Sequence, residues 1–149
     1  MMFSWKHTKT LITTVVLIAF SLSISWLWLK SPWNAKAPVS VASEFLHLLY
    51  QREYLQAHEL TLKNGYVGRT VMELERVAAH QLCGGANKFM YTWPRQSNGN
   101  RLRRWLRGTD PNLSRVWVEI DGPACLMSVE VRPAEDGQWR VFKFQSHAG

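Results

Sequence analysis

The amino-acid sequence predicts an α+β protein in which an N-terminal transmembrane helix is followed by three helices packed on a curved antiparallel sheet. Two observations support this fold class. A stretch of nineteen residues without a charge lies near the N-terminus. After it, the apolar residues recur first with the period of a helix and then, from about residue 89, with the period of a strand. Helices followed by a run of strands are typical of a domain whose helices cover one face of a sheet.

The uncharged stretch runs from Leu11 to Leu29, and its polar residues are all Thr or Ser. At about 1.5 Å per residue it covers roughly 28 Å, which is close to the hydrocarbon thickness of a bilayer. A cleaved signal peptide is the alternative, but its apolar region is usually shorter and ends at a small-residue cleavage site. The only Ala-x-Ala here directly precedes Pro38. We therefore expect an uncleaved single-pass anchor with an interfacial tryptophan belt at its far end, made of Trp26, Trp28 and Trp33.

The flanks of this stretch set the expected topology. Each flank carries two lysines, so the N-terminal amine and His7 tip the balance toward an N-terminus in the cytoplasm. Residues 1–10 are then a cytoplasmic tail, 30–37 a linker that contains Pro32, and 38–149 an extracytoplasmic domain. In a bacterium this arrangement places the anchor in the inner membrane and the domain in the periplasm.

The charge of the chain is unevenly distributed. All 11 acidic residues lie in residues 38–149, together with 14 of the 18 lysines and arginines, so the domain carries +3 of the total +7. This small excess argues against nucleic acid as a partner.

Three helices are expected before the sheet. Ser40 is a candidate N-cap for a stripe of apolar residues at helical spacing, and a second short helix follows from Tyr54. Thr70 and Glu73 fit a capping box that opens a third helix, which Gly84-Gly85 would end. A lone tetratricopeptide-like hairpin is the alternative for the first two helices, but no second copy follows.

Residues alternate between apolar and polar in the second half of the chain, which indicates strands. Asn98-Gly99 is a typical hairpin turn and is expected to lead into a strand formed by RLRRWLR. The expected strands are 89–93, 101–107, 115–121, 125–132 and 139–145.

The opening phrase FLHLLYQREYLQAHELT and the closing strand QWRVFKFQ, joined in the order helices then strands, resemble the cone-shaped, cystatin-like superfamily of ketosteroid isomerase and scytalone dehydratase. The resemblance covers about residues 38–147. It implies the fold alone, because this superfamily includes enzymes, ligand-binding pockets and assembly domains. The isomerase family's catalytic tyrosine and aspartate have no matching position here. Bitopic inner-membrane subunits of type IV secretion machines share the layout of an anchor followed by a cone.

Cys83 and Cys125 are the only cysteines, and an even pair in an extracytoplasmic domain suggests a disulfide. It would close a loop of about forty residues and stabilise the fold by roughly 3 to 4 kcal/mol. Two buried free thiols are the alternative. A metal site that adds His80 falls short of the usual four ligands, so no metal and no cofactor are expected.

The segment RLRRWLR supplies the candidate binding surface. As a strand it would place Leu102, Arg104 and Leu106 on one face, and on the other a basic, aromatic set made of Arg101, Arg103, Trp105 and Arg107. Such a set fits an anionic partner, namely a phospholipid headgroup, an acidic protein face or a nucleic-acid backbone. A solvated outer face without a partner is the alternative.

No catalytic residue is predicted. His47, His58 and His80 are the histidines on the expected helices, and none has a carboxylate at a recognisable spacing. The sequence therefore favours a membrane-anchored, extracytoplasmic binding or assembly module of a cell-envelope or secretion complex, with a protein partner or a second copy of the chain. The alternative is a small-molecule-binding or enzymatic domain that uses a pocket between the helices and the sheet.

Overall fold

The computed structural model describes residues 5–33, 36–82, 88–122 and 124–147. The chain divides into two compact units. The anchor unit contains residues 1–33 and 96–112, and the sheet unit contains residues 34–95 and 113–149.

The anchor unit contains the helices α1 (Trp5–Lys30) and α5 (Asn98–Leu106). Residues Ile12–Lys30 of α1 are long and apolar enough to cross a membrane, and no part of this span is buried inside the chain. A core helix of a soluble protein would be covered, whereas the large apolar side chains of this span from Ile12 to Trp28 are more than half exposed. Ser21 and Ser23 donate hydrogen bonds to carbonyl oxygens one turn earlier, so their hydroxyls are satisfied without water. The predicted apolar helix is confirmed.

The predicted strand at residues 101–107 is wrong, because these residues belong to α5 and the turn that ends it. Ser97 caps the helix with its hydroxyl, which accepts a hydrogen bond from the Asn100 amide at 3.2 Å, and the expected hairpin turn is instead the first helical turn. Arg101, Arg103, Trp105 and Arg107 therefore share no strand face. The spacing of Leu102, Trp105 and Leu106 is i, i+3, i+4, which suits a helix better than an alternating strand.

The sheet unit begins with α2 (Lys36–Tyr50), α3 (Tyr54–Glu59) and α4 (Val71–Gln81). The predicted linker 30–37 is too long and Ser40 is not a cap, because α2 already begins at Lys36. Pro38 is tolerated there because the first turn of a helix leaves its amides unbonded. The cap of α4 is confirmed, since the Thr70 hydroxyl accepts from the Glu73 amide at 3.3 Å. The glycine pair Gly84-Gly85, expected to end this helix, lies outside the described residues.

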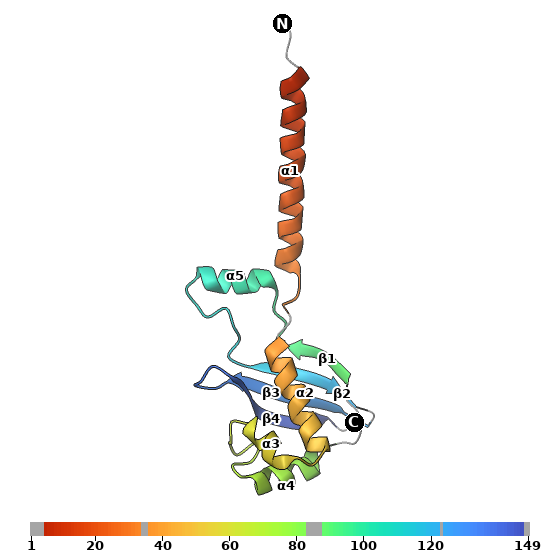
Figure 1. Ribbon diagram of the computed structural model, residues 1–149, viewed down its shortest axis with the longest axis vertical. Helices are drawn as coiled ribbons and strands as arrows, with labels where there is room; N and C mark the ends of the chain where they lie inside the picture. Colours follow the sequence, from red (N-terminus) through yellow and green to blue (C-terminus); the bar gives the residue numbers. More distant parts are fainter. Residues whose placement is uncertain (1–4, 34–35, 83–87, 123, 148–149) are drawn as a thin grey trace. The chain divides into compact units, whose positions relative to one another are not determined.

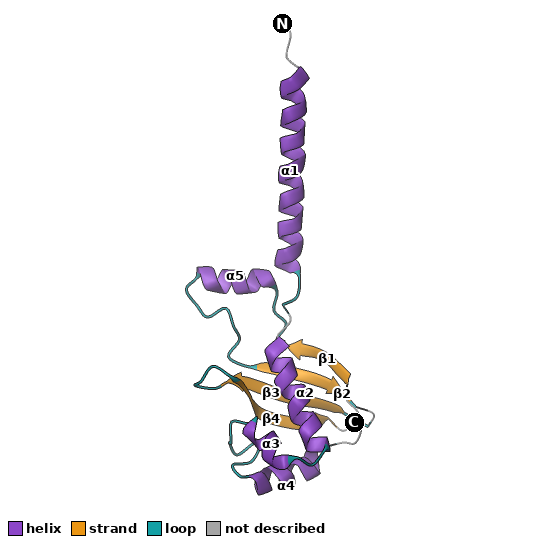
Figure 2. Ribbon diagram, in the orientation of Figure 1, coloured by secondary structure: helices purple, strands orange, loops and turns teal. Residues whose placement is uncertain are grey.

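Four antiparallel strands form an open sheet in the order β1-β2-β3-β4 (Figure 2). They are β1 (Lys88–Trp93), β2 (Val116–Asp121), β3 (Leu126–Pro133) and β4 (Trp139–His147). The strands predicted at 89–93, 115–121, 125–132 and 139–145 are confirmed, with ends that differ by one or two residues. The chain between the paired strands β1 and β2 contains α5.

The core lies between one face of this sheet and the helices of the sheet unit (Figure 1). Alternate residues of β2 and β3 are buried on this face, as the period of two requires. Phe45 of α2 packs edge to face on Phe144 of β4, with ring centroids 5.2 Å apart. Both rings are fully buried together with Leu46, Leu49 and Met127.

The outer edge of β4 is occupied by other segments of the sheet unit. The Val141 amide donates to the Leu60 carbonyl at 2.8 Å, and the Val141 carbonyl accepts from the Leu62 amide at 2.9 Å. Further along, Asn64 donates to the Phe142 carbonyl, and the Ser146 amide donates to the side chain of Gln81. In the part of the sheet unit that the structure describes, β1 is thus the edge to which no further strand is added.

Only one of the two cysteines of the predicted disulfide lies in the described residues. Cys83 lies outside the described residues, whereas Cys125 is buried just before β3. The bridge between them stays a prediction.

Candidate functional site

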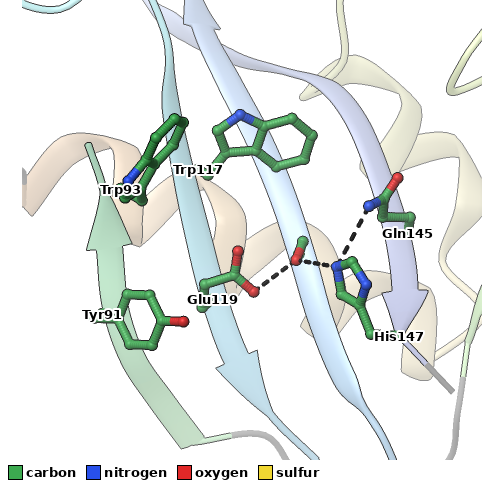
Figure 3. A pocket seen from close by; sticks show the side chains of 7 residues that line it. Tyr91, Trp93, Trp117, Glu119, Gln145 and His147 are labelled. Atoms are coloured by element: carbon green, nitrogen blue, oxygen red, sulfur yellow. Dashed lines mark hydrogen bonds between the residues drawn. The ribbon is translucent and has the colours of Figure 1, made fainter. Parts of the chain in front are cut away.

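A shallow depression lies on the face of the sheet opposite the core. Its volume is about 290 Å³, and side chains from all four strands line it (Figure 3). The lining residues are Tyr91, Trp93, Trp117, Glu119, Ser128, Gln145 and His147.

The strand register brings these side chains together. Trp93 pairs with Trp117, and Tyr91 pairs with Glu119 in the next row. The second row then continues from Glu119 to Ser128 and Gln145. Because directly paired residues point to the same face of a sheet, each row forms a continuous band of side chains away from the core.

Aromatic side chains from the two strands at one side of the sheet form a wall of the depression. Tyr91 and Trp93 of β1 are exposed, and Trp117 of β2 is partly buried beside them. The guanidinium of Arg95 already lies 5.6 Å from the centroid of the Tyr91 ring. The electron-rich faces of these rings are suited to a cation or to a flat apolar group.

A chain of hydrogen bonds forms the floor (Figure 3). The Ser128 hydroxyl donates to the Glu119 carboxylate at 2.6 Å, and His147 Nε2 lies 2.7 Å from the same hydroxyl oxygen. Because the hydroxyl has a single proton and gives it to Glu119, His147 Nε2 must be the donor to Ser128. The side-chain nitrogen of Gln145 lies 3.3 Å from the same Nε2, and because an amide nitrogen only donates, this contact is a hydrogen bond only in the tautomer in which Nε2 accepts.

This order of hydrogen bonds does not activate Ser128 as a nucleophile. A nucleophilic serine gives its proton to a histidine that a carboxylate orients. Here the serine proton points to the carboxylate, the histidine is a donor, and Ser128 is only 1% exposed. The chain instead fixes a carboxylate and an imidazole at the depression, where both can bind a ligand.

The residues predicted as site candidates lie elsewhere. His47 and His80 are exposed on α2 and α4, and the buried His58 lies with Nε2 3.3 Å from the Gly68 carbonyl, as a structural histidine does. The four residues of the predicted basic strand are on or directly after α5 in the anchor unit. In the described part of the chain, no group of three or more His, Cys, Asp or Glu could hold a metal ion.

The depression itself was not predicted, although part of its signal is in the sequence. The alternation of the strands assigns Trp117, Glu119 and Ser128 to the face away from the core. The missing information is long-range, because only the register shows that Trp93 and His147 join them. His147 also follows the last predicted strand, which was expected to end at residue 145.

The depression therefore offers three aromatic faces, a carboxylate, an imidazole and an amide on one face of the sheet. This set can bind a cationic or flat group, and its function is inferred from this chemistry. Comparisons of the chain with protein-family models, with curated proteins and with solved structures gave no match.

Proposed function

We propose that this chain is a single-pass membrane protein whose extracytoplasmic domain binds a protein partner on the outer face of its sheet. The single observation that supports this most is the aromatic and acidic depression that crosses all four strands. The span in α1 supplies the anchor. The proposed orientation keeps the N-terminus in the cytoplasm and, in a bacterial inner membrane, the domain in the periplasm.

A lysine or arginine side chain of the partner fits this depression best. Aromatic faces attract cations, and Glu119 supplies a compensating carboxylate beside them. The position of Arg95 over Tyr91 shows that a guanidinium can lie on this wall. The proposal also agrees with the resemblance of the sequence to the cone superfamily, because some members of that superfamily are assembly domains.

The alternative function, a pocket between helices and sheet, has less support. The space between α2 and the sheet is filled by side chains that are completely or almost completely buried, including Phe45, Leu46 and Phe144. A small ligand would have to use the outer depression instead, and its volume of about 290 Å³ lies just below the usual range for ligand sites, which begins at about 300 Å³.

Site-directed photocrosslinking in the native membrane tests the proposal. A benzophenone amino acid at Trp93, on the wall of the depression, should give a protein adduct that mass spectrometry can identify. The same residue at Leu55, which is exposed on α3, is the matched control and should give no adduct. In a chain that also carries Glu119→Gln, the Trp93 adduct should weaken because the carboxylate no longer attracts the cation.

Two results would contradict the proposal. Equal adducts at Trp93 and Leu55 would show that contact with the partner is not specific to the depression. A Trp93 probe without any protein adduct, combined with a small molecule that remains bound to the purified chain in native mass spectrometry and is lost in Trp93→Ala, would favour the small-molecule alternative.

A further inference from the structure

The helix α5 has an apolar side that no other part of the anchor unit covers among the described residues. Leu102, Trp105 and Leu106 lie at positions i, i+3 and i+4, and their exposed fractions are 37%, 64% and 69%. At 100° per residue they share one side of the helix. Clustered exposed side chains of this size indicate a contact with another apolar surface.

The opposite side of α5 is strongly basic. Arg103, Arg104 and Arg107 lie there or at its margins, and residues 95–107 contain five arginines and no acidic residue. A short helix with apolar side chains that include tryptophan on one side and arginines on the other is typical of helices that lie in a membrane interface.

The N-terminus of α5 is fixed to the end of α1. The Asn98 amide donates to the Ser31 carbonyl at 3.2 Å, and the Asn98 side chain donates to the Ser31 hydroxyl at 2.9 Å. Gly99 permits this contact, because a Cβ atom at this position would lie 2.9 Å from the Leu29 carbonyl oxygen. Figure 1 shows α5 crosswise to α1 at the end of α1. If α1 crosses a bilayer, α5 therefore lies along the surface of that bilayer.

The apolar side of α5 is continuous with its contact to α1. Leu102 and Leu106 are three and seven residues after Gly99, so all three lie on one stripe of the helix. Gly99 meets the last turns of α1, from which α1 runs back through its apolar span. The stripe that continues from Gly99 therefore faces the membrane.

Two cationic side chains, Lys30 and Arg103, lie at the junction of the two helices. A cavity of about 430 Å³ lies between them, and its lining includes Trp26, Lys30, Asn100 and Arg103. The ammonium of Lys30 lies 4.6 Å from the Trp26 ring centroid. Tryptophan and lysine at the end of an apolar span mark the headgroup level, where anionic lipids concentrate.

We propose that α5 is an interfacial helix that binds the surface of the bilayer crossed by α1. Leu102, Trp105 and Leu106 enter the boundary between headgroups and acyl chains, and the exposed Arg103 and Arg107 contact anionic headgroups. This inference rests on the membrane anchor of the proposed function and is independent of the ligand of the sheet. Both the position of α5 and its positive charge favour a bilayer as the surface that covers its apolar side.

Depth measurements on the full-length chain in lipid vesicles test this inference. A nitroxide is attached to an encoded ketone residue, so that both cysteines stay unmodified, at Leu102, Leu106, Arg104 or Arg107 in separate samples. Ile18 in α1 is the control for spanning. Collisions with oxygen report lipid exposure, and collisions with a polar nickel complex report water exposure.

We expect labels at Leu102 and Leu106 to be accessible to oxygen and protected from nickel, and labels at Arg104 and Arg107 to show the reverse, with a period of about 3.6 residues. Replacing Arg103 and Arg107 by Gln should reduce the depth at Leu106 in vesicles with anionic phospholipid and leave it unchanged in zwitterionic vesicles. An unchanged depth in both would overturn the headgroup contact.

The other outcomes separate this inference from the anchor. Nickel access at Leu106 combined with nickel protection at Ile18 would show that α1 spans and α5 does not bind the bilayer. Protection of Leu106 from both reagents would place its side chain in a protein contact and also overturn the inference. Nickel access at Ile18 would show that the anchor itself has failed.

Discussion

Glu130 illustrates at the residue scale how the outer face of the sheet holds a buried charge. Its side chain is 4% exposed, and its Oε1 accepts hydrogen bonds from the guanidinium of Arg132 at 2.8 and 2.7 Å. That guanidinium also lies 3.4 Å from the ring centroid of Phe142. A carboxylate in such a position depends on its partner, because its own side chain has almost no access to water.

Arg132→Ala should therefore destabilise the fold by about 1 to 3 kcal/mol, because it removes both hydrogen bonds to the Glu130 carboxylate, and the 35% exposure of the Arg132 side chain keeps the cost below that of a fully buried pair. Denaturant unfolding measures this change. The matched control is Arg140→Ala, whose partner Asp136 is 45% exposed, so it should cost under about 1 kcal/mol. The pKa of Asp136 is lowered first by the hydrogen bond from the Gln138 amide and only then by Arg140. Equal costs of the two substitutions would contradict the buried character of Glu130.

At the scale of elements, the strands and α4 were predicted because their signals are local. Alternation marks the strands, and the Thr70 capping box marks the start of α4. The segment at α5 was misread because Asn98-Gly99 is both a hairpin signal and an acceptable first helical turn after a serine cap. Whether this segment forms a helix or a strand depends on the docking of Asn98 and Gly99 to the end of α1. This contact joins residues about seventy positions apart, so local sequence patterns do not contain it.

Gly99→Val should detach α5 from α1, because the added side chain collides with a backbone oxygen that cannot rotate away. Hydrogen exchange followed by mass spectrometry should show faster exchange of the Asn98 amide, by roughly tenfold for a loss of about 1.4 kcal/mol in the local opening free energy. Gly65→Val is the control, since a Cβ at Gly65 meets nothing within 4 Å. Unchanged protection of Asn98 in Gly99→Val would rule out the docking as described.

At the scale of the whole molecule, the sequence predicted the apolar helix α1 and the α+β class of the domain, but not the place of the depression. Apolar length and composition are sufficient to identify α1. The depression depends on residues up to 56 positions apart, from Tyr91 to His147, that only the sheet register brings together. The chemistry of each residue is visible in the sequence, whereas their proximity is a property of the fold.

The proposed anchor leads to a prediction for the full-length protein. It should stay in the membrane fraction after high-salt and carbonate washes, because the uncharged span keeps it in the bilayer. A reporter fused after Gly149 should be active only outside the cytoplasm. A mature N-terminus near Pro38 would instead identify residues before it as a cleaved signal, and reporter activity in the cytoplasm would reverse the topology.

The unequal edges of the sheet limit how copies of this protein can associate. The outward backbone groups at Val141, Phe142 and Ser146 of β4 are occupied, whereas no described strand pairs with the outer edge of β1, so β1 is the favoured edge for a strand from another molecule. Two copies that join through β1 would form one continuous sheet around a twofold axis, with a β4 edge at each end. Such a pair is closed by symmetry. Growth into a fibre would need a second unpaired sheet edge, and among the described strands only β1 forms one.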